Sequence, residues 1–299
     1  MTNRHSLLKN IVYSIITVTL LFLFVEILLR SIGFSISIEN ESLYDSVLGD
    51  YKPNQDMINN MYPELKHHIY INSQGFRGNE FDIEKNPPII RVLLLGDSNT
   101  YGARVNNEET YAVLLEKFLN KQDKGYEVIN AGHSSYTIRE EYEYFVEKGF
   151  KLNPDIVMVN FNPANDLTEL SRQISWRDYL RKHKSYEPFK SILKNLALYN
   201  FLLKNLAHII IKTKTFATPQ VDMNLINILS EEMSPIEKDL MEKYKDYIIQ
   251  LNKNDKMQSK KLLFVSYPSY EQLNYKEGHD KYQRELISFF EINKIKYIT

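Results

Sequence analysis

The chain has 299 residues, 43% of them hydrophobic, so it can bury the core of one large α/β domain with extensions. Its 37 Lys and Arg residues nearly balance its 38 Asp and Glu residues, which excludes a global electrostatic field that would attract nucleic acid or a strongly charged substrate. Because the chain contains no cysteine, disulfides, thiolate nucleophiles and thiolate metal sites are excluded as well.

The first predicted element is an apolar helix near the N-terminus. Residues 11–29 are apolar or hydroxylated except for Glu26, and as a helix they would span roughly 28 Å, close to the hydrocarbon thickness of a bilayer. Basic residues precede this stretch, whereas residues 31–51 carry acids and no Lys or Arg. We therefore expect one membrane helix within residues 1–34, a cytoplasmic N-terminus, and a periplasmic or extracellular remainder. A cleaved signal peptide is the alternative, and we interpret Glu26 as tolerated near the outer end of the span.

Residues 35–88 form a polar juxtamembrane segment with many turn signals. The strand-like runs in it are short, as at 68–72. From residue 89 to residue 299, strand-like and helix-like segments alternate. Strands are expected at 89–95, 126–131, 156–161, 261–267 and 295–298, and helices at 108–121, 138–150, 235–251 and 281–293. This alternation favours right-handed βαβ crossovers and a parallel sheet, which defines an α/β class.

A helical insertion interrupts the alternation at about residues 168–233. Residues 172–216 hold ten Lys or Arg against two acids, and residues 189–211 suit a helix that is too apolar for full exposure. An inserted helix that packs on the domain, with its charges in solvent, is one interpretation. A basic amphipathic helix that lies on the membrane surface or covers the site is the other.

A serine is presented at the end of the first predicted strand of the domain. The apolar run 89–95 leads directly into Gly96-Asp97-Ser98. Ligand and catalytic groups in open α/β sheets gather at the carboxyl ends of the strands, so we expect the Ser98 hydroxyl at the rim of a crevice. Nucleophilic acyl chemistry is the simplest interpretation, and an ordinary turn is the alternative for this motif taken alone.

Two further motifs follow the next two strands. The three motifs, in chain order, are Gly96-Asp97-Ser98, Asn130-Ala131-Gly132 and Asn165-Asp166. In type and order they resemble the motifs of the SGNH or GDSL hydrolases, and the resemblance to a membrane-anchored bacterial subgroup runs from the apolar span to residue 299. The resemblance implies a flavodoxin-like, three-layer α/β/α fold with a parallel sheet.

The resemblance also implies roles for five residues. Ser98 is the expected nucleophile, and the Ser98 N–H, the Gly132 N–H and the Asn165 amide are the expected donors to an oxyanion. Loss of one such donor typically raises the barrier by about 2.7 to 4 kcal/mol. Gly132 should lack a side chain so that its backbone can approach the substrate. Asp97 and Asn130 are supporting residues, and we expect Asp97 to brace the turn; without the other motifs, Asn165 would be interpreted as a helix cap.

The sequence departs from the family pattern in two places. Pro163 stands where the family usually has glycine, two positions before Asn165. The final Asp-x-x-His block, which supplies the base that activates the serine, is not found, and His279 fits it poorly. We interpret His133 as a loop histidine that contacts solvent. We expect the chain to be a fragment of a longer protein rather than a degenerate member, with little hydrolysis in this form.

The sequence therefore predicts a membrane-anchored serine ester hydrolase or O-acyltransferase that acts outside the cytoplasm, on acyl esters such as the acetyl esters of surface polysaccharide. A non-catalytic carbohydrate-binding or assembly protein of the same fold is the alternative, and the outward topology disfavours a phosphate-binding receiver. No cluster of His, Asp or Glu has ligand spacing, so we expect neither a metal nor an organic cofactor. We expect no nucleic-acid partner.

Overall fold

The structure is a computed structural model that describes residues 2–32, 48–59, 65–122, 125–163, 165–183, 193, 196–199, 201–202, 225–274 and 280–299. The strands that position the site are β1 (Gln55–Asn59), β2 (His67–Ile71), β3 (Ile90–Gly96), β4 (Tyr126–Gly132), β5 (Ile156–Phe161), β6 (Lys261–Ser266) and β7 (Lys296–Ile298). The α-helices are α1 (Thr2–Ser31), α2 (Ser98–Tyr101), α3 (Tyr111–Leu119), α4 (Ile138–Glu147), α5 (Asp166–Leu170), α6 (Trp176–His183), α9 (Pro235–Lys253), α10 (Tyr270–Asn274) and α11 (Lys281–Asn293).

Five of the strands form a parallel sheet in the order β4-β3-β5-β6-β7. Numbered within this sheet, the order is 2-1-3-4-5, which is the flavodoxin-like arrangement. The predicted α/β class with a parallel sheet is confirmed, and all five predicted strands are found within one residue of their expected ends.

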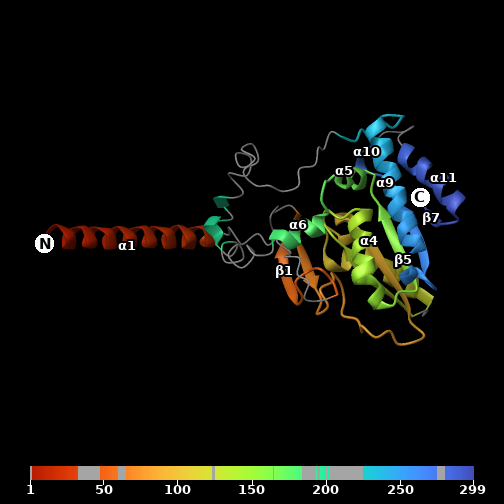
Figure 1. Cartoon of the computed structure of the whole chain (residues 1–299). Helices are drawn as coiled ribbons and strands as arrows, with labels where there is room; N and C mark the ends of the chain where they lie inside the picture. Colours follow the sequence, from red (N-terminus) through yellow and green to blue (C-terminus); the bar gives the residue numbers. More distant parts are fainter. Residues whose placement is uncertain are drawn as a thin grey trace.

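Helices cover both faces of the sheet, which gives three layers (Figure 1). Successive side chains of a strand point to opposite faces. In β3, Leu93 and Leu95 therefore belong to the large core beneath α4, α9 and α11, whereas Val92 and Leu94 pack with Ala112 of α3 on the other face. Burial on both faces explains why this strand is a nearly continuous apolar run.

Two helices of the large core, α4 and α9, begin at capping boxes. At the start of α4, the Glu140 carboxylate accepts the Thr137 N–H at 3.1 Å, and the Thr137 hydroxyl accepts the Arg139 N–H. At the start of α9, Ser234 and Glu237 form the same reciprocal pair. These local signals fix the residue at which each helix begins and so set where the loop before it ends.

The N-terminal helix α1 extends away from the domain (Figure 1). Its residues Lys9–Ser31 are long and apolar enough to cross a membrane, with a mean hydropathy of 2.5. A signal sequence near an N-terminus meets the same criteria of length and composition. The predicted apolar helix is therefore found, while its insertion in a bilayer and its orientation stay predictions.

The polar segment before residue 89 is more structured than its sequence indicates. β1 and β2 pair as an antiparallel hairpin with Asp56 opposite Tyr70, and only the second of these strands was expected. Arg77, 1% exposed, donates hydrogen bonds to the carbonyl oxygens of Gly102 and Val105 in the loop after α2. This segment therefore packs against the domain, and the predicted boundary at residue 88 is crossed by buried contacts.

The predicted insertion begins with α5 and α6. Most of the helix expected at 189–211 lies outside the described residues. One contact of the described part corrects the interpretation of Glu26, which is 7% exposed and accepts the backbone N–H groups of Ala197 and Leu198 at 2.8 and 2.9 Å. Glu26 is thus bound by a distant segment rather than merely tolerated at the end of the span.

Candidate active site

Ser98 lies at the carboxyl edge of the sheet, as predicted. α2 is a single turn that begins at Ser98, just after β3 ends. The side chain of Asp97 is the N-cap of this turn and accepts the Asn99 N–H at 2.8 Å. This hydrogen bond ties the Asp97 side chain to the turn that carries Ser98. The side chain of Ser98 is partly exposed, so a substrate can reach it.

Asp97 is also the point at which the ends of three strands meet. The residue is 1% exposed. Its Oδ2 accepts amide N–H groups from Asn162 at 2.9 Å and from Asn165 at 3.1 Å, both of which follow β5. Its Oδ1 accepts the hydroxyl of Tyr267, which follows β6, at 3.2 Å. The turn that carries Ser98 is therefore held beside Asn165, although the two are far apart in the chain.

Asn165 makes a different contact from a simple helix cap. It stands at the N-cap position of α5, but its side chain makes no capping hydrogen bond there. Instead its Nδ2 donates to Asp97. An amide nitrogen carries two hydrogens, so this bond leaves the second N–H of Asn165 to act on an oxyanion.

Gly132 packs directly against α2. A Cβ at this position would lie 2.4 Å from the backbone nitrogen of Tyr101 and 2.7 Å from the carbonyl carbon of Thr100. The missing side chain therefore admits the backbone of α2, and its expected role beside a substrate stays a prediction. In addition, the Gly132 N–H donates to Oδ1 of Asn130 at 3.0 Å, so the expected oxyanion donor is already paired within its own strand.

The side-chain amide of Asn130 forms hydrogen bonds through both its oxygen and its nitrogen. Its Oδ1 holds the Gly132 N–H, and its Nδ2 donates to the carbonyl oxygen of Tyr101 at 3.3 Å. The residue is 3% exposed. Asn130 thus ties the end of β4 to α2, which fits the supporting role expected for it.

Ser135 is a residue that sequence reasoning missed. It lies in the loop after β4 with φ at 67°, and its carbonyl oxygen accepts a hydrogen bond from Arg172 at 2.8 Å. A left-handed backbone is uncommon in a residue other than glycine, and such conformations cluster at functional sites. Nothing in Ser134-Ser135 as a sequence indicates this geometry, because serine has no strong preference for it.

His133 is not a solvent-contacting loop residue, so that prediction was wrong. It is 2% exposed and stacks between Tyr51, at a ring-centroid distance of 3.9 Å, and Tyr136, at 4.6 Å. Burial, aided by the charge of Lys148, lowers the pKa of His133 well below its usual value. The imidazole is therefore neutral and packs as an aromatic ring.

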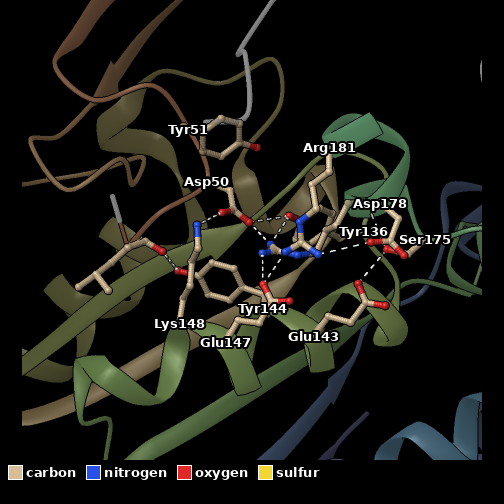
Figure 2. A network of polar contacts seen from close by, with 12 residues as sticks. Asp50, Tyr51, Tyr136, Glu143, Tyr144, Glu147, Lys148, Ser175, Asp178 and Arg181 are labelled. Carbon is tan, nitrogen blue, oxygen red and sulfur yellow. Dashed lines mark hydrogen bonds and ion pairs between the residues drawn. The ribbon is translucent and has the colours of Figure 1, made fainter. Parts of the chain in front are cut away.

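A buried polar network holds the same loop (Figure 2). Asp50, 4% exposed, accepts the hydroxyl of Tyr136 at 2.9 Å and pairs with Lys148 and Arg177. Arg177 pairs in turn with Glu147 of α4 at 2.9 Å. The segment before the domain, the loop after β4 and α6 are thus joined at one charged cluster.

Two more carboxyl groups lie buried near Asp97. Glu141 and Asp166 are 1% and 0% exposed. Burial first, and then the charge of Asp97, raise the pKa of both groups well above their usual range. Both carboxyl groups therefore keep their protons to a higher pH than exposed carboxyl groups do.

A base for Ser98 is not found in the part of the chain whose side chains are described. No histidine there donates to or accepts from the Ser98 hydroxyl: His133 is stacked as above, and His68 contacts Asp56. His279 lies outside the described residues. Among the described residues, no group of three or more His, Asp or Glu residues is placed to hold a metal ion.

No family model and no curated protein matches the chain. Solved structures similar to it include a lipolytic protein of the G-D-S-L family from Desulfitobacterium hafniense, with 13% identity, a TM-score of 0.38, and coverage of 69% of this chain and 75% of that one. A catalytic mutant of an acetylxylan esterase from Geobacillus stearothermophilus has 14% identity, a TM-score of 0.37, and coverage of 70% and 75%. A GDSL-like lipase from Bacteroides thetaiotaomicron has 15% identity, a TM-score of 0.33, and coverage of 70% and 67%.

The first and the third of these neighbours bear the name GDSL, which is that of the family whose motifs the chain resembles. At such identities and TM-scores the likeness carries no argument for activity. The fold and the site together define an α/β protein of flavodoxin-like strand order with a serine turn anchored at the carboxyl edge of its sheet.

Proposed function

We propose that the chain is a serine ester hydrolase or O-acyltransferase, anchored in a membrane by residues 11–29 and facing outward from the cytoplasm. Its substrates are acyl esters, and acetyl esters of surface polysaccharide are the class we favour. The observation that carries the proposal is the convergence on Asp97, because it holds Ser98 and Asn165 at one edge of the sheet.

In the proposed reaction, the Ser98 oxygen attacks the ester carbonyl carbon while a base takes its proton. The carbonyl electrons move to oxygen, where the Ser98 N–H and the second N–H of Asn165 stabilise the charge. Collapse expels the alcohol, which takes up a proton. The acyl group on Ser98 then passes to water in hydrolysis or to an acceptor hydroxyl in transfer.

A second candidate is a non-catalytic glycan-binding or assembly protein of the same fold. Two observations favour it: the Gly132 N–H is already paired, and none of the histidines with described side chains contacts Ser98. Removal of the base leaves serine enzymes with only the acceleration that the oxyanion donors and binding supply.

A fluorophosphonate probe tests the nucleophile on the full chain in vesicles. Slow labelling that is lost in S98A and kept in S288A, a substitution of an exposed serine on α11, supports the proposal. Because one oxyanion donor is worth about 2.7 to 4 kcal/mol, N165A should slow labelling by roughly 100-fold or more. Equal labelling of S98A and the unaltered chain would refute the role of Ser98.

Acetylated glycan separates the two candidates. Release of acetate that depends on Ser98 supports the enzyme. Binding of the glycan that is unchanged in S98A, with no release of acetate, would favour the binding protein instead.

A further inference from the structure

The end of α1 nearest the domain has one covered face. Most side chains of the apolar stretch are exposed, as Ile27 is at 66%, but Glu26 and Leu29 are both 7% exposed. These two lie three residues apart and so share a side of the helix. A short helical piece of the insertion lies beside this end of α1 (Figure 1).

The covering segment is fixed by hydrogen bonds to Glu26. The carboxylate accepts the N–H groups of Ala197 and Leu198, one on each oxygen, and it also pairs with Arg30 at 2.7 Å. Ala197 is fully buried, and its small side chain lets the two backbones approach. A carboxylate at the edge of a bilayer is costly unless it is paired, so these partners stabilise each other.

The contact with Glu26 also predicts how deep in the bilayer the covering segment lies. Glu26 lies five residues before the end of α1 at Ser31, which is about 7.5 Å along the helix axis. If Lys9–Ser31 crosses the bilayer with its midpoint at Leu20, Glu26 lies about 9 Å from the middle, which is about 6 Å inside the edge of a hydrocarbon core about 30 Å thick. The N–H groups of Ala197 and Leu198 must lie at that same level.

Two apolar side chains further along the segment are partly exposed. Phe201 is 37% exposed and Leu202 is 45% exposed. The surrounding residues 172–216 have ten basic residues against two acids, which favours attraction to anionic lipid headgroups. An apolar face with basic neighbours is the composition of segments that lie in the interface.

We propose that residues 196–199, 201 and 202 lie in the membrane interface on the side of the domain, bound to α1 through Glu26 and with Leu202 among the acyl chains. The partner of this surface is lipid. The inference rests on the membrane anchoring proposed above. It gives the domain a second attachment to the bilayer, which limits how freely it can turn about the end of α1.

Nitroxide labels on single cysteines test the depth, because the chain has no cysteine of its own. Three leucines are replaced one at a time in the full chain, reconstituted in phosphatidylcholine and phosphatidylglycerol vesicles. L20C reports the middle of α1, L202C the proposed interface, and L273C an exposed position on the domain. Collisions with oxygen and with a water-soluble nickel complex are compared by electron paramagnetic resonance.

We expect the label at 202 to lose nickel accessibility relative to the label at 273, as the label at 20 does. If the label at 20 is accessible to nickel, the anchoring itself is wrong. If the label at 20 is protected and the label at 202 behaves like the one at 273, the anchoring stands and the interfacial segment is refuted.

The E26A variant tests the hydrogen bonds that Ala197 and Leu198 donate to Glu26. It should restore nickel accessibility at 202 while leaving the label at 20 protected. Unchanged protection at 202 in E26A would overturn the role of Glu26 in holding the segment.

Discussion

At the scale of single residues, Asp97 accepts hydrogen bonds from residues that follow three different strands, which its place in a turn motif does not indicate. Its carboxylate is buried and accepts hydrogen bonds from neutral groups, which are the side-chain amides of Asn99, Asn162 and Asn165 and the hydroxyl of Tyr267. Hydrogen bonds to a charged acceptor are worth about 1.5 to 3 kcal/mol each. The site is therefore preorganised by one acid rather than by each of its residues separately.

Replacing Asp97 by asparagine tests this arrangement. In D97N an NH₂ group must face amide donors that now lack an acceptor, so we expect the free energy of unfolding to fall by about 3 kcal/mol. Denaturant titration measures the change. D56N, at an aspartate whose side chain is 72% exposed, is the control and should change stability by no more than about 0.5 kcal/mol. Equal stability of the two variants would contradict the role of Asp97.

At the scale of elements, the site depends on how closely α2 lies against β4. The G132A variant adds a methyl group at 2.4 Å from a backbone atom of α2, which must then move. We expect a loss of about 1 to 3 kcal/mol of stability and a loss of Ser98 labelling. The control is G125N, because Gly125 lies just before the start of β4, no atom lies within 4 Å of its Cβ position, and asparagine tolerates its φ of 66°. Normal labelling of G132A would show that the contact does not position Ser98.

The packing of α4 against the start of the insertion predicts a dependence on pH. Burial raises the pKa of Glu143 to about 7, and Ser175 donates to its carboxylate at 2.8 Å. The ordinary value is 4.5, so between these pH values the folded state holds a proton that the unfolded state releases. The stability contributed by this group is complete below about pH 4.5 and is lost as the pH rises through about 7.

E143Q keeps the neutral form at every pH. Since the side chain is partly in solvent, we expect only on the order of 1 kcal/mol of stability gained over the unaltered chain between pH 5 and pH 8. Urea titrations at both pH values measure it, with E242Q, at a side chain that is 69% exposed, as the control. A parallel loss of stability in E143Q and the unaltered chain would argue against a protonated Glu143.

At the scale of the whole molecule, the polar segment before the first sheet strand is part of the domain. Phe76 belongs to the large core, Arg77 bonds the loop after α2, and Asp50 neutralises Arg177 and Lys148. Removal of one partner of a buried ion pair typically costs about 3 to 5 kcal/mol, which approaches the total stability of many domains.

A chain of residues 48–299 should therefore fold, whereas residues 89–299 should not. Circular dichroism and thermal melting of the two are the measurement: we expect a cooperative transition for the longer chain alone. Equal transitions for the two chains would support the predicted domain boundary at residue 88.

The sequence by itself determined the apolar N-terminal helix, the five parallel strands and the placement of Ser98, because periodicity and apolar runs are local properties of the chain. It could not show the hairpin partner β1, the burial of His133, or the reason for Gly132. Each of these depends on a residue far away in the chain, such as Tyr51 beside His133 or Tyr101 beside Gly132. Only the tertiary structure decided them, since a side chain's burial and hydrogen-bond partners follow from which segments meet, and no spacing in the sequence records that meeting.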